Sequence, residues 1–418
     1  MCYVPGPARP VAESNPIMQP IVIDKPYAFI APRLSRFWLW VARRLGAKQL
    51  RRDYGVTAVE CVGAEHLRAS LAAGQGILLV VNHCRPCDPL VMDTLAREVG
   101  RPFHTIASWH VFMEGGWWKR FMLPRIGAFS VYREGLDRES LKCSAQILKD
   151  GRNPLVIFAE GCVSRCNDRL LNLMEGPAFL ARTAAKQRPD GRVVIHPVFI
   201  RYFFEGDLTA TVTPVVEAIE TRLSWQPQRQ ASLLDRIAKV GHALLALKEI
   251  EHVQAPQAGS ARQRVARLMD HLLTPLEQQW CGGRNDGDAM ARVKRLRTAI
   301  LPDMITSELS ESERAARWRH MADLYLVQQL HCYPGDYIEQ PTAERILETV
   351  ERYEEDLTDV ASAHPPLRAV ISVGEGFEVG PLRDRSLATD PITAELRQRM
   401  ELLLEQSKAQ RRQAPTGN

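Results

Sequence analysis

The chain of 418 residues lacks any apolar run that approaches the ~20 residues of a transmembrane helix. It also lacks the apolar core of a secretory signal, because residues 1–24 are rich in proline and their only apolar stretch is Ile21-Val22-Ile23. A formal net charge of +5 is too small to favour a nucleic-acid partner. We therefore expect a cytoplasmic protein without membrane-spanning segments.

The nine cysteines form no recognisable disulfide framework, since their number is odd and they are scattered along the chain. Free thiols in a reducing compartment are the expected state. Cys84, Cys87, Cys162 and Cys166 could supply four thiolates to a structural zinc site if their loops meet at one sheet edge. That site would occupy the region expected to bind substrate, so we predict no metal and keep zinc as an alternative.

The first candidate catalytic residues follow the apolar run 76–81. This run is typical of a strand covered on both faces. Asn82-His83-Cys84-Arg85-Pro86-Cys87-Asp88 follows it directly. Asp88 and Pro89 are predicted to be the N-cap and the first residue of a helix. His83 would then lie in a strand-to-helix loop, where open α/β folds bind ligands.

A carboxylate that accepts a hydrogen bond from one imidazole nitrogen fixes the tautomer and makes the other nitrogen a better base. The pattern thus favours His83 as a general base that is oriented by Asp88. The alternative is that Asp88 only caps its helix and that the loop histidine has no chemical role.

Further blocks follow in the same half of the chain. Residues 126–133 form an apolar segment that ends in Arg133, and residues 155–161 end in Glu160-Gly161. Residues 193–201 form a third apolar segment, which is interrupted by Pro197. Each is predicted to be a strand.

Taken in order, these blocks resemble the glycerolipid acyltransferase family, whose best-known members are the PlsC-like 1-acylglycerol-3-phosphate acyltransferases. The family pattern is NHxxxxD, a glycine-containing strand closing on Arg, FPEGTRS, and a strand with Val-Pro-Val or Ile-Pro-Val. This chain has Asn82-His83 to Asp88, Gly127 to Arg133, Phe158 to Ser164, and His196-Pro197-Val198. The resemblance covers residues 55–205.

The resemblance implies an α/β fold with a mixed, mostly parallel sheet and flanking helices. It also implies acyl transfer from acyl-CoA or acyl carrier protein to a lysolipid hydroxyl, without a cofactor. His83 and Asp88 would be the catalytic dyad, and Arg133, Glu160 and Gly161 would shape the acceptor site.

The third block departs from the family pattern, because Ala159, Cys162 and Val163 replace the usual Pro, Thr and Arg. Guanidinium is a natural bidentate partner of phosphate, so Arg165 or Arg169 would have to substitute for the missing arginine. We expect 1-acylglycerol-3-phosphate as acceptor. The alternatives are a lysolipid without phosphate and a lipid-binding scaffold that has lost catalysis.

Arg133, Glu160 and Gly161 also have simpler interpretations. Arg133 could be a solvated residue paired with Glu134, Glu160 could be an ion-paired or capping carboxylate, and Gly161 could serve only a tight turn.

Between Arg33 and Arg52 there are seven basic residues and no acidic one. On a helical wheel an apolar face lies opposite Arg36 and Arg43, and its members are Leu34, Phe37, Trp38, Val41 and Leu45. This pattern is typical of a helix that lies in a membrane interface. The alternative is a surface helix packed on the domain. We expect peripheral association with the membrane.

We predict three parts: residues 1–54 with the interfacial helix, an acyltransferase domain over 55–250, and a mainly helical accessory region over 263–418. Helical patterns occur at 235–251, 263–279, 289–300, 311–330 and 343–357. Residues 367–373 look like a lone strand, followed by a glycine turn. Opposite charges on neighbouring helices favour solvated faces that pair with each other.

Overall fold

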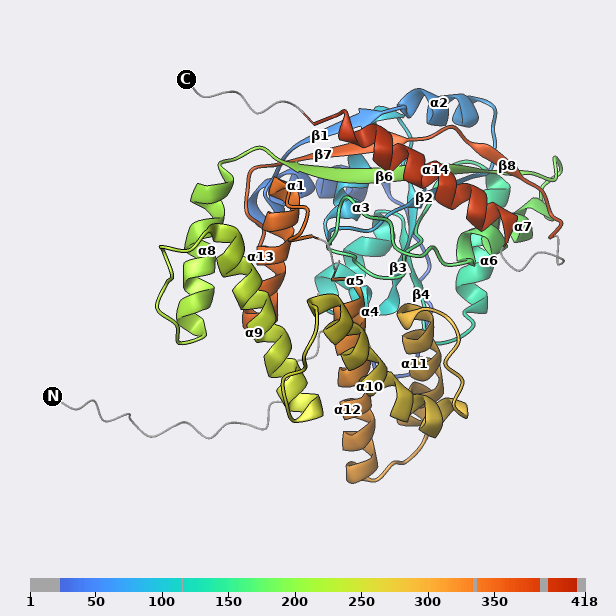
Figure 1. Ribbon diagram of the computed structural model, residues 1–418. Helices are drawn as coiled ribbons and strands as arrows, with labels where there is room; N and C mark the ends of the chain where they lie inside the picture. The colour runs from blue at the N-terminus through green and yellow to red at the C-terminus, as the bar shows by residue number, and fades with distance from the viewer. Residues whose placement is uncertain (1–22, 115, 334–336, 384–389, 412–418) are drawn as a thin grey trace, which may run out of the picture. The chain divides into compact units, whose positions relative to one another are not determined.

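A computed structural model describes residues 23–114, 116–333, 337–383 and 390–411 (Figure 1). The chain divides into two compact units. One comprises residues 27–265 and 332–418, and the other comprises residues 1–26 and 266–331. Within the described ranges, no helix has both the length and the apolar character needed to cross a membrane.

The first unit is built on one eight-stranded sheet with the order β1-β7-β6-β2-β5-β3-β4, in which β8 also pairs with β6. β6 is antiparallel to β7 and β8, and the other pairs are parallel. The strands are β1 Val56–Val62, β2 Ile77–Val81, β3 His104–Ser108, β4 Ala128–Val131, β5 Leu155–Phe158, β6 Val193–Phe204, β7 Leu367–Val373 and β8 Phe377–Val379. The predicted α/β class with a mixed, mostly parallel sheet is confirmed.

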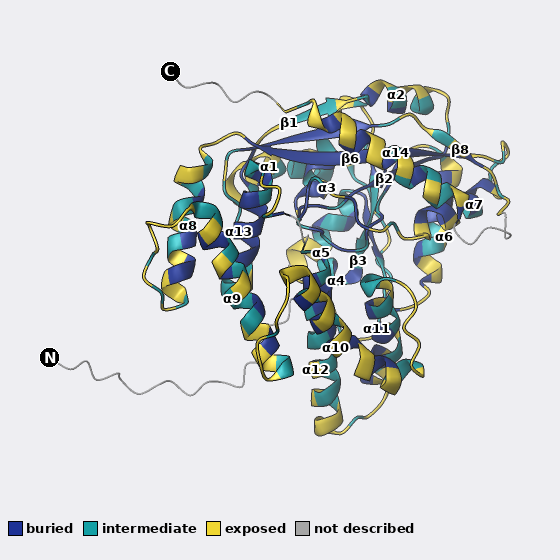
Figure 2. Ribbon diagram, viewed as in Figure 1, coloured by how far each residue is buried: buried dark blue, intermediate teal, exposed yellow. Residues whose placement is uncertain are grey.

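The centre of the sheet is buried on both faces, as Figure 2 shows by its dark blue strands. All residues of β2 and of β6 are buried. Because successive side chains of a strand point to opposite faces, Leu79 and Val81 join one core cluster while Leu78 and Val80 join the other. This explains why the run 76–81 shows no alternation of polar and apolar residues.

Helices cover both faces of this sheet. One core cluster contains residues of α3, α8 and α13, and the other contains residues of α6, α7 and α14. The helices of this unit are α1 Arg36–Tyr54, α2 Ala64–Ala72, α3 Asp88–Glu98, α4 Trp109–Glu114, α5 Gly116–Arg125, α6 Arg138–Asp150, α7 Gly176–Ala185, α8 Leu208–Arg222, α9 Leu233–Val253, α13 Ala343–Thr358 and α14 Pro391–Lys408. Several begin at a side-chain cap, such as Asp137, which accepts from the Ser140 amide of α6.

The C-terminal segment completes the sheet. β7 pairs in parallel with β1 and antiparallel with β6, so the interpretation of residues 367–373 as a lone strand is wrong. Gly374 and Gly376 lie in the connection from β7 to β8. Pairing between strands that are distant in the sequence leaves no local pattern, so the sequence of β7 does not reveal its partners.

The second unit contains α11 Ala289–Thr306, α12 Glu311–His331 and most of α10 Ala261–Cys281. Arg292 of α11 forms an ion pair of 2.8 Å with Glu277 of α10. The helices expected at 235–251, 263–279, 289–300, 311–330 and 343–357 correspond to α9, α10, α11, α12 and α13. The boundaries of the two compact units differ from the predicted divisions, because residues 332–418 group with the sheet.

Candidate active site

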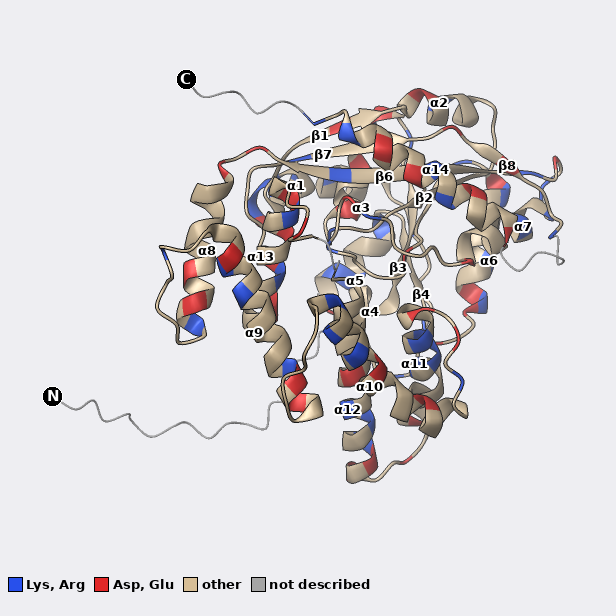
Figure 3. Ribbon diagram, viewed as in Figure 1, with Lys and Arg blue, Asp and Glu red and all other residues tan. Residues whose placement is uncertain are grey.

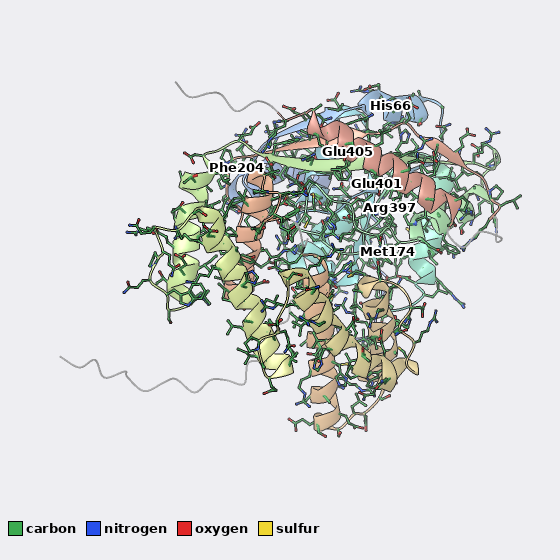
Figure 4. The ribbon with its side chains drawn as sticks, viewed as in Figure 1. His66, Met174, Phe204, Arg397, Glu401 and Glu405 are labelled. Carbon is green, nitrogen blue, oxygen red and sulfur yellow. The ribbon has the colours of Figure 1, made fainter. Side chains whose placement is uncertain are left out.

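The candidate site lies where two neighbouring strands, β2 and β5, end beside the longer strand β6. β2 is hydrogen-bonded to β5 on one side and to β6 on the other, and Val81 is level with Phe158 and Val198. Parallel strands place their carboxyl ends at one sheet edge, which brings the loops after β2 and β5 together. β6 runs on to Phe204, which Figure 4 labels, so the last residues of this strand pass beside both loops.

The predicted dyad is assembled in this loop. Nδ1 of His83 lies 2.8 Å from Oδ2 of Asp88. The imidazole stacks on the ring of Phe158 at 4.3 Å between centroids. The Asp88 side chain is fully buried, whereas 19% of the His83 side chain is exposed. With Nδ1 bound to the carboxylate, Nε2 is the ring nitrogen left for proton transfer.

Asp88 is held by two further donors. The Arg85 amide donates to Oδ2 at 3.0 Å, and the Tyr202 hydroxyl donates to Oδ1 at 2.6 Å. Burial and the negative charge of Asp88 raise the pKa of Tyr202 well above its usual value, so the hydroxyl remains a neutral donor. These bonds fix the carboxylate in one orientation.

The prediction that Asp88 is the N-cap is wrong. α3 begins at Asp88 itself, and its N-cap residue is Cys87, which makes no side-chain capping bond. The carboxylate faces the loop, where the His83 ring, the Arg85 amide and the Tyr202 hydroxyl surround it. The alternative in which Asp88 only caps its helix is therefore also wrong.

Glu160 connects the two loops through backbone bonds. Its Oε2 accepts from the His83 amide and its Oε1 from the Leu171 amide, both at 2.7 Å. Burial raises the pKa of this carboxyl, and the two N–H donors partly oppose the shift. The described contacts of Glu160 thus orient the backbone that carries the histidine, and its predicted part in acceptor binding remains a prediction.

Gly161 adopts a left-handed conformation with φ of 75°. A Cβ atom there would lie 2.7 Å from Sδ of Met174, which Figure 4 labels. Both observations favour glycine at this position. Its carbonyl accepts a hydrogen bond from the guanidinium of Arg133, which follows β4. Two predicted acceptor residues are thereby brought into contact.

Arg165 was one candidate to replace the missing family arginine. Its guanidinium binds both carboxylate oxygens of Glu355 at 2.6 and 2.5 Å. Arg169 is exposed, and Val163 is partly buried. Arg133, in contrast to Arg165, donates to a neutral carbonyl, that of Gly161.

Sequence reasoning missed several residues that build the site. The Asn82 side chain pairs with the backbone of Ile200, accepting at 2.7 Å and donating at 3.0 Å. Arg85 forms an ion pair of 3.0 Å with Glu351 of α13. Asn82 stood inside the motif without an assigned role. Tyr202 and Glu351 carried no local signal, since one lies in an apolar strand and the other in an acidic helix far along the chain.

The thiols proposed for zinc have separate neighbours. Cys87 lies 3.4 Å from the Tyr202 hydroxyl, whereas Cys162 lies 3.7 Å from Sγ of Cys332. Among the residues that the structure describes, no group of three or more His, Cys, Asp or Glu side chains is arranged to hold a metal ion. The zinc alternative therefore has no support in the geometry.

A mixed sheet with a histidine-carboxylate pair after a central strand defines an α/β domain suited to proton transfer at a hydroxyl. Residues 58–201 match the family model described as Acyltransferase, which confirms the resemblance to the PlsC-like glycerolipid acyltransferases. This match over residues 58–201 supports a general acyltransferase activity. No curated protein sequence gives a significant match to the chain.

Proposed function

We propose that this acyltransferase moves a fatty acyl group from an acyl thioester to the hydroxyl of a lysophospholipid-like acceptor, as a step of phospholipid biosynthesis. The contact between Nδ1 of His83 and Asp88, with the ring partly exposed, carries the proposal. It leaves one nitrogen of a fixed tautomer available to a substrate hydroxyl.

In the proposed reaction, Nε2 of His83 accepts the hydroxyl proton as the acceptor oxygen attacks the thioester carbonyl. A carbon–oxygen ester bond forms, the carbon–sulfur bond breaks, and the imidazolium returns the proton to the leaving thiolate. The carboxylate of Asp88 stabilises the imidazolium between these steps. No redox or other group transfer is involved, so acyl-CoA or acyl carrier protein as co-substrate suffices and we propose no further cofactor.

We propose 1-acylglycerol-3-phosphate as the acceptor, with Arg133 binding its phosphate. Guanidinium has five N–H donors, and the hydrogen bond from Arg133 to the Gly161 carbonyl uses one nitrogen. The pairing of Arg165 with Glu355 argues against Arg165 as a second phosphate ligand. If Arg133 has no such role, a lysolipid without phosphate is the second candidate acceptor.

We also propose a peripheral membrane surface on the first unit, on the cytoplasmic leaflet. Aromatic side chains of α1 and α5 form a continuous cluster through edge and stacked contacts: Phe37, Trp38, Trp117, Trp118 and Phe121. Phe37 is 62% exposed and Trp117 is 75% exposed. Tryptophan, which has an apolar ring body and a polar N–H group, favours the membrane interface, and the exposed ring of Phe37 adds apolar area.

The orientation of α1 agrees with this surface. Arg43, on the face opposite the apolar stripe, pairs with Asp93 of α3 at 3.0 Å. At this turn Arg43 faces the protein, while Phe37 and Leu45 of the apolar stripe are exposed and Trp38 and Val41 are partly buried. The packed-helix alternative accounts for Arg43 but not for the exposure of Phe37.

Vesicle co-sedimentation tests the surface. The double variant Phe37→Ser with Trp117→Ser is expected to lose binding to vesicles that contain anionic phospholipid, and added salt should weaken wild-type binding. Leu402→Ser on α14 is the matched control, since Leu402 is also exposed, at 56%. Equal binding of the double variant and the wild type would refute the surface.

The direct test of function is an acyl-transfer assay with purified protein, radiolabelled acyl-CoA or acyl carrier protein, and a panel of lysolipids. Product on thin-layer plates with lysophosphatidic acid supports the proposal. Product only with lysolipids that lack the phosphate monoester favours the second acceptor. Binding of lysolipid without any product identifies the lipid-binding scaffold instead.

A further inference from the structure

Helix α13 lies outside the segment that matches the acyltransferase family, yet it contacts both motif loops of the candidate site. Four of its side chains make these contacts, and their spacing places them on one face of the helix. Figure 3 shows acidic and basic segments along α13. The four residues are Glu348, Glu351, Arg352 and Glu355.

The loop after β2 is held through Arg85. Its guanidinium pairs with Glu351 at 3.0 Å, and both side chains are buried. The same guanidinium lies over the ring of Tyr202, 5.3 Å from the centroid. The backbone amide of Arg85 donates to Oδ2 of Asp88, the oxygen that His83 also contacts. A displacement of Arg85 would therefore disturb the hydrogen bond that its amide donates directly to Asp88 of the dyad.

The loop after β5 is held by the remaining side chains of the same face. Arg352 donates to the Ser164 carbonyl at 2.8 Å, Glu355 binds Arg165, and Glu348 accepts from Asn167. The Ser164 amide in turn donates to the His83 carbonyl at 2.7 Å.

The same face of α13 closes the space between the two loops. Its four side chains, together with Cys84, Arg85 and Arg165, line one small cavity. The first loop is therefore tied to α13 directly through Arg85 and indirectly through the loop after β5. Both connections end at His83 or at Asp88.

We propose that α13 positions the His83–Asp88 dyad, with Arg85 and Glu351 as the positioning residues. The inference rests on the proposed function for its kinetic consequence but not for its structural one. A buried guanidinium left without its carboxylate moves toward other partners or solvent, because an unpaired charge is costly in a low-dielectric site. The Arg85 amide then no longer fixes Asp88, and small misplacements of a catalytic group have large effects on rate.

The test compares Glu351→Gln with Glu354→Gln in the full chain. Glu354 lies on the same helix but pairs with His364 at 2.9 Å and with neither motif loop. Glu351→Gln is expected to lower kcat by about ten- to a hundredfold with little change in the KM of the thioester. Glu354→Gln should keep the wild-type kcat. Glu355→Gln is the second variant, because its ion pair is partly exposed and its removal is easier for the fold to accept.

A second readout does not need activity. In protein labelled with ¹⁵N-histidine, the proton on Nδ1 of His83 is assigned by its loss in His83→Ala. This signal should shift or broaden in Glu351→Gln and stay in place in Glu354→Gln. An unchanged signal in both Glu351→Gln and Glu355→Gln would overturn the positioning role. Absence of transfer by the wild type refutes the proposed function instead, and the spectrum still decides the role of α13.

Discussion

Helices α12 and α13 follow each other in the sequence, and both carry many charged residues, but they belong to different compact units. In α12, Arg317 pairs with Asp303 of α11 at 3.0 Å, and half of the Asp303 side chain is exposed. In α13, Glu348 and Glu351 are buried against the motif loops. The expectation of solvated, mutually paired faces fits the first helix and is wrong for the second.

The difference shows that a charged helix face is buried where the surface packed against it carries complementary charges and hydrogen-bonding groups. The loops after β2 and β5 present Arg85, Arg165 and backbone carbonyls, which need counter-charges and donors once they are covered. In the second unit, ion pairs join the helices to one another, as between Arg292 of α11 and Glu277 of α10 and between Arg317 of α12 and Asp303 of α11. Their ion pairs are expected to matter for stability, whereas those of α13 are expected to matter for catalysis as well.

The largest contrast should come from the same substitution made in each unit. His83→Ala is expected to reduce acyl transfer by about a hundredfold to ten-thousandfold with little change in thermal stability, because a general base contributes to rate and not to packing. His271→Ala, at an exposed position of α10, should leave the rate unchanged. Near wild-type turnover by His83→Ala would mean that His83 is not the base.

Arginine substitutions sharpen the contrast for the acceptor. Arg133→Ala should raise the KM of lysophosphatidic acid about tenfold while sparing that of the thioester, because a charge-assisted bond contributes about 1.5–3 kcal/mol. Arg284→Ala in the second unit, where the pair with Asp286 is exposed, should change neither constant. Steady-state kinetics with each substrate varied separately decide the matter. An unchanged acceptor KM in Arg133→Ala would favour an acceptor without phosphate.

Tyrosine hydroxyls give a smaller effect. Tyr202→Phe removes the 2.6 Å bond to Oδ1 of Asp88 and should lower kcat about fivefold, since the His83 and Arg85 contacts on Oδ2 remain. Tyr325→Phe on α12 is the matched variant in the second unit, and we expect it to keep the wild-type kcat. Equal activity of Tyr202→Phe and the wild type would remove Tyr202 from the positioning of the dyad.

The smallest effect concerns pH and stability. Burial raises the pKa of Glu348 from 4.5 to about 7, with Asp168 and Glu351 acting in the same direction and Arg85 and Asn167 against it. The folded state then binds the proton more tightly than the unfolded state. The stability that this provides is fully present below pH 4.5 and is lost as pH rises through about 7.

Glu348→Gln mimics the protonated acid at every pH. Its Tm should therefore rise relative to that of the wild type as the pH is raised from 5 to 8. A stability difference of one kcal/mol corresponds to about 2–4 °C in Tm. The opposite shift occurs at Glu313 of the second unit, whose pKa is lowered by bonds from Ser310. The stability that Glu313 contributes is lost only as pH falls below the usual pKa range of a glutamate. The Tm of Glu313→Gln should thus keep a constant difference from the wild-type Tm between pH 5 and pH 8. A Tm difference that did not change with pH for Glu348→Gln would contradict the raised pKa of Glu348.

The motif residues could be placed from the sequence because each follows a strand that its own composition reveals. The run 76–81 predicts a buried strand, and chain connectivity then puts His83 at its carboxyl end. The same reasoning placed Glu160 after β5. It failed at Asp88, because a carboxylate before a proline looks like a helix cap whether it faces the helix or the loop.

The sequence by itself determined which elements exist near the motifs and which side chains their ends carry, since strand and helix periodicity is local. Only the tertiary structure decided that β7 lies between β1 and β6, that Tyr202 reaches Asp88, and that α13 covers Arg85. Those contacts join residues that are far apart in the chain. Their partners are chosen by the shared burial of charges and hydrogen-bonding groups, which no local pattern records.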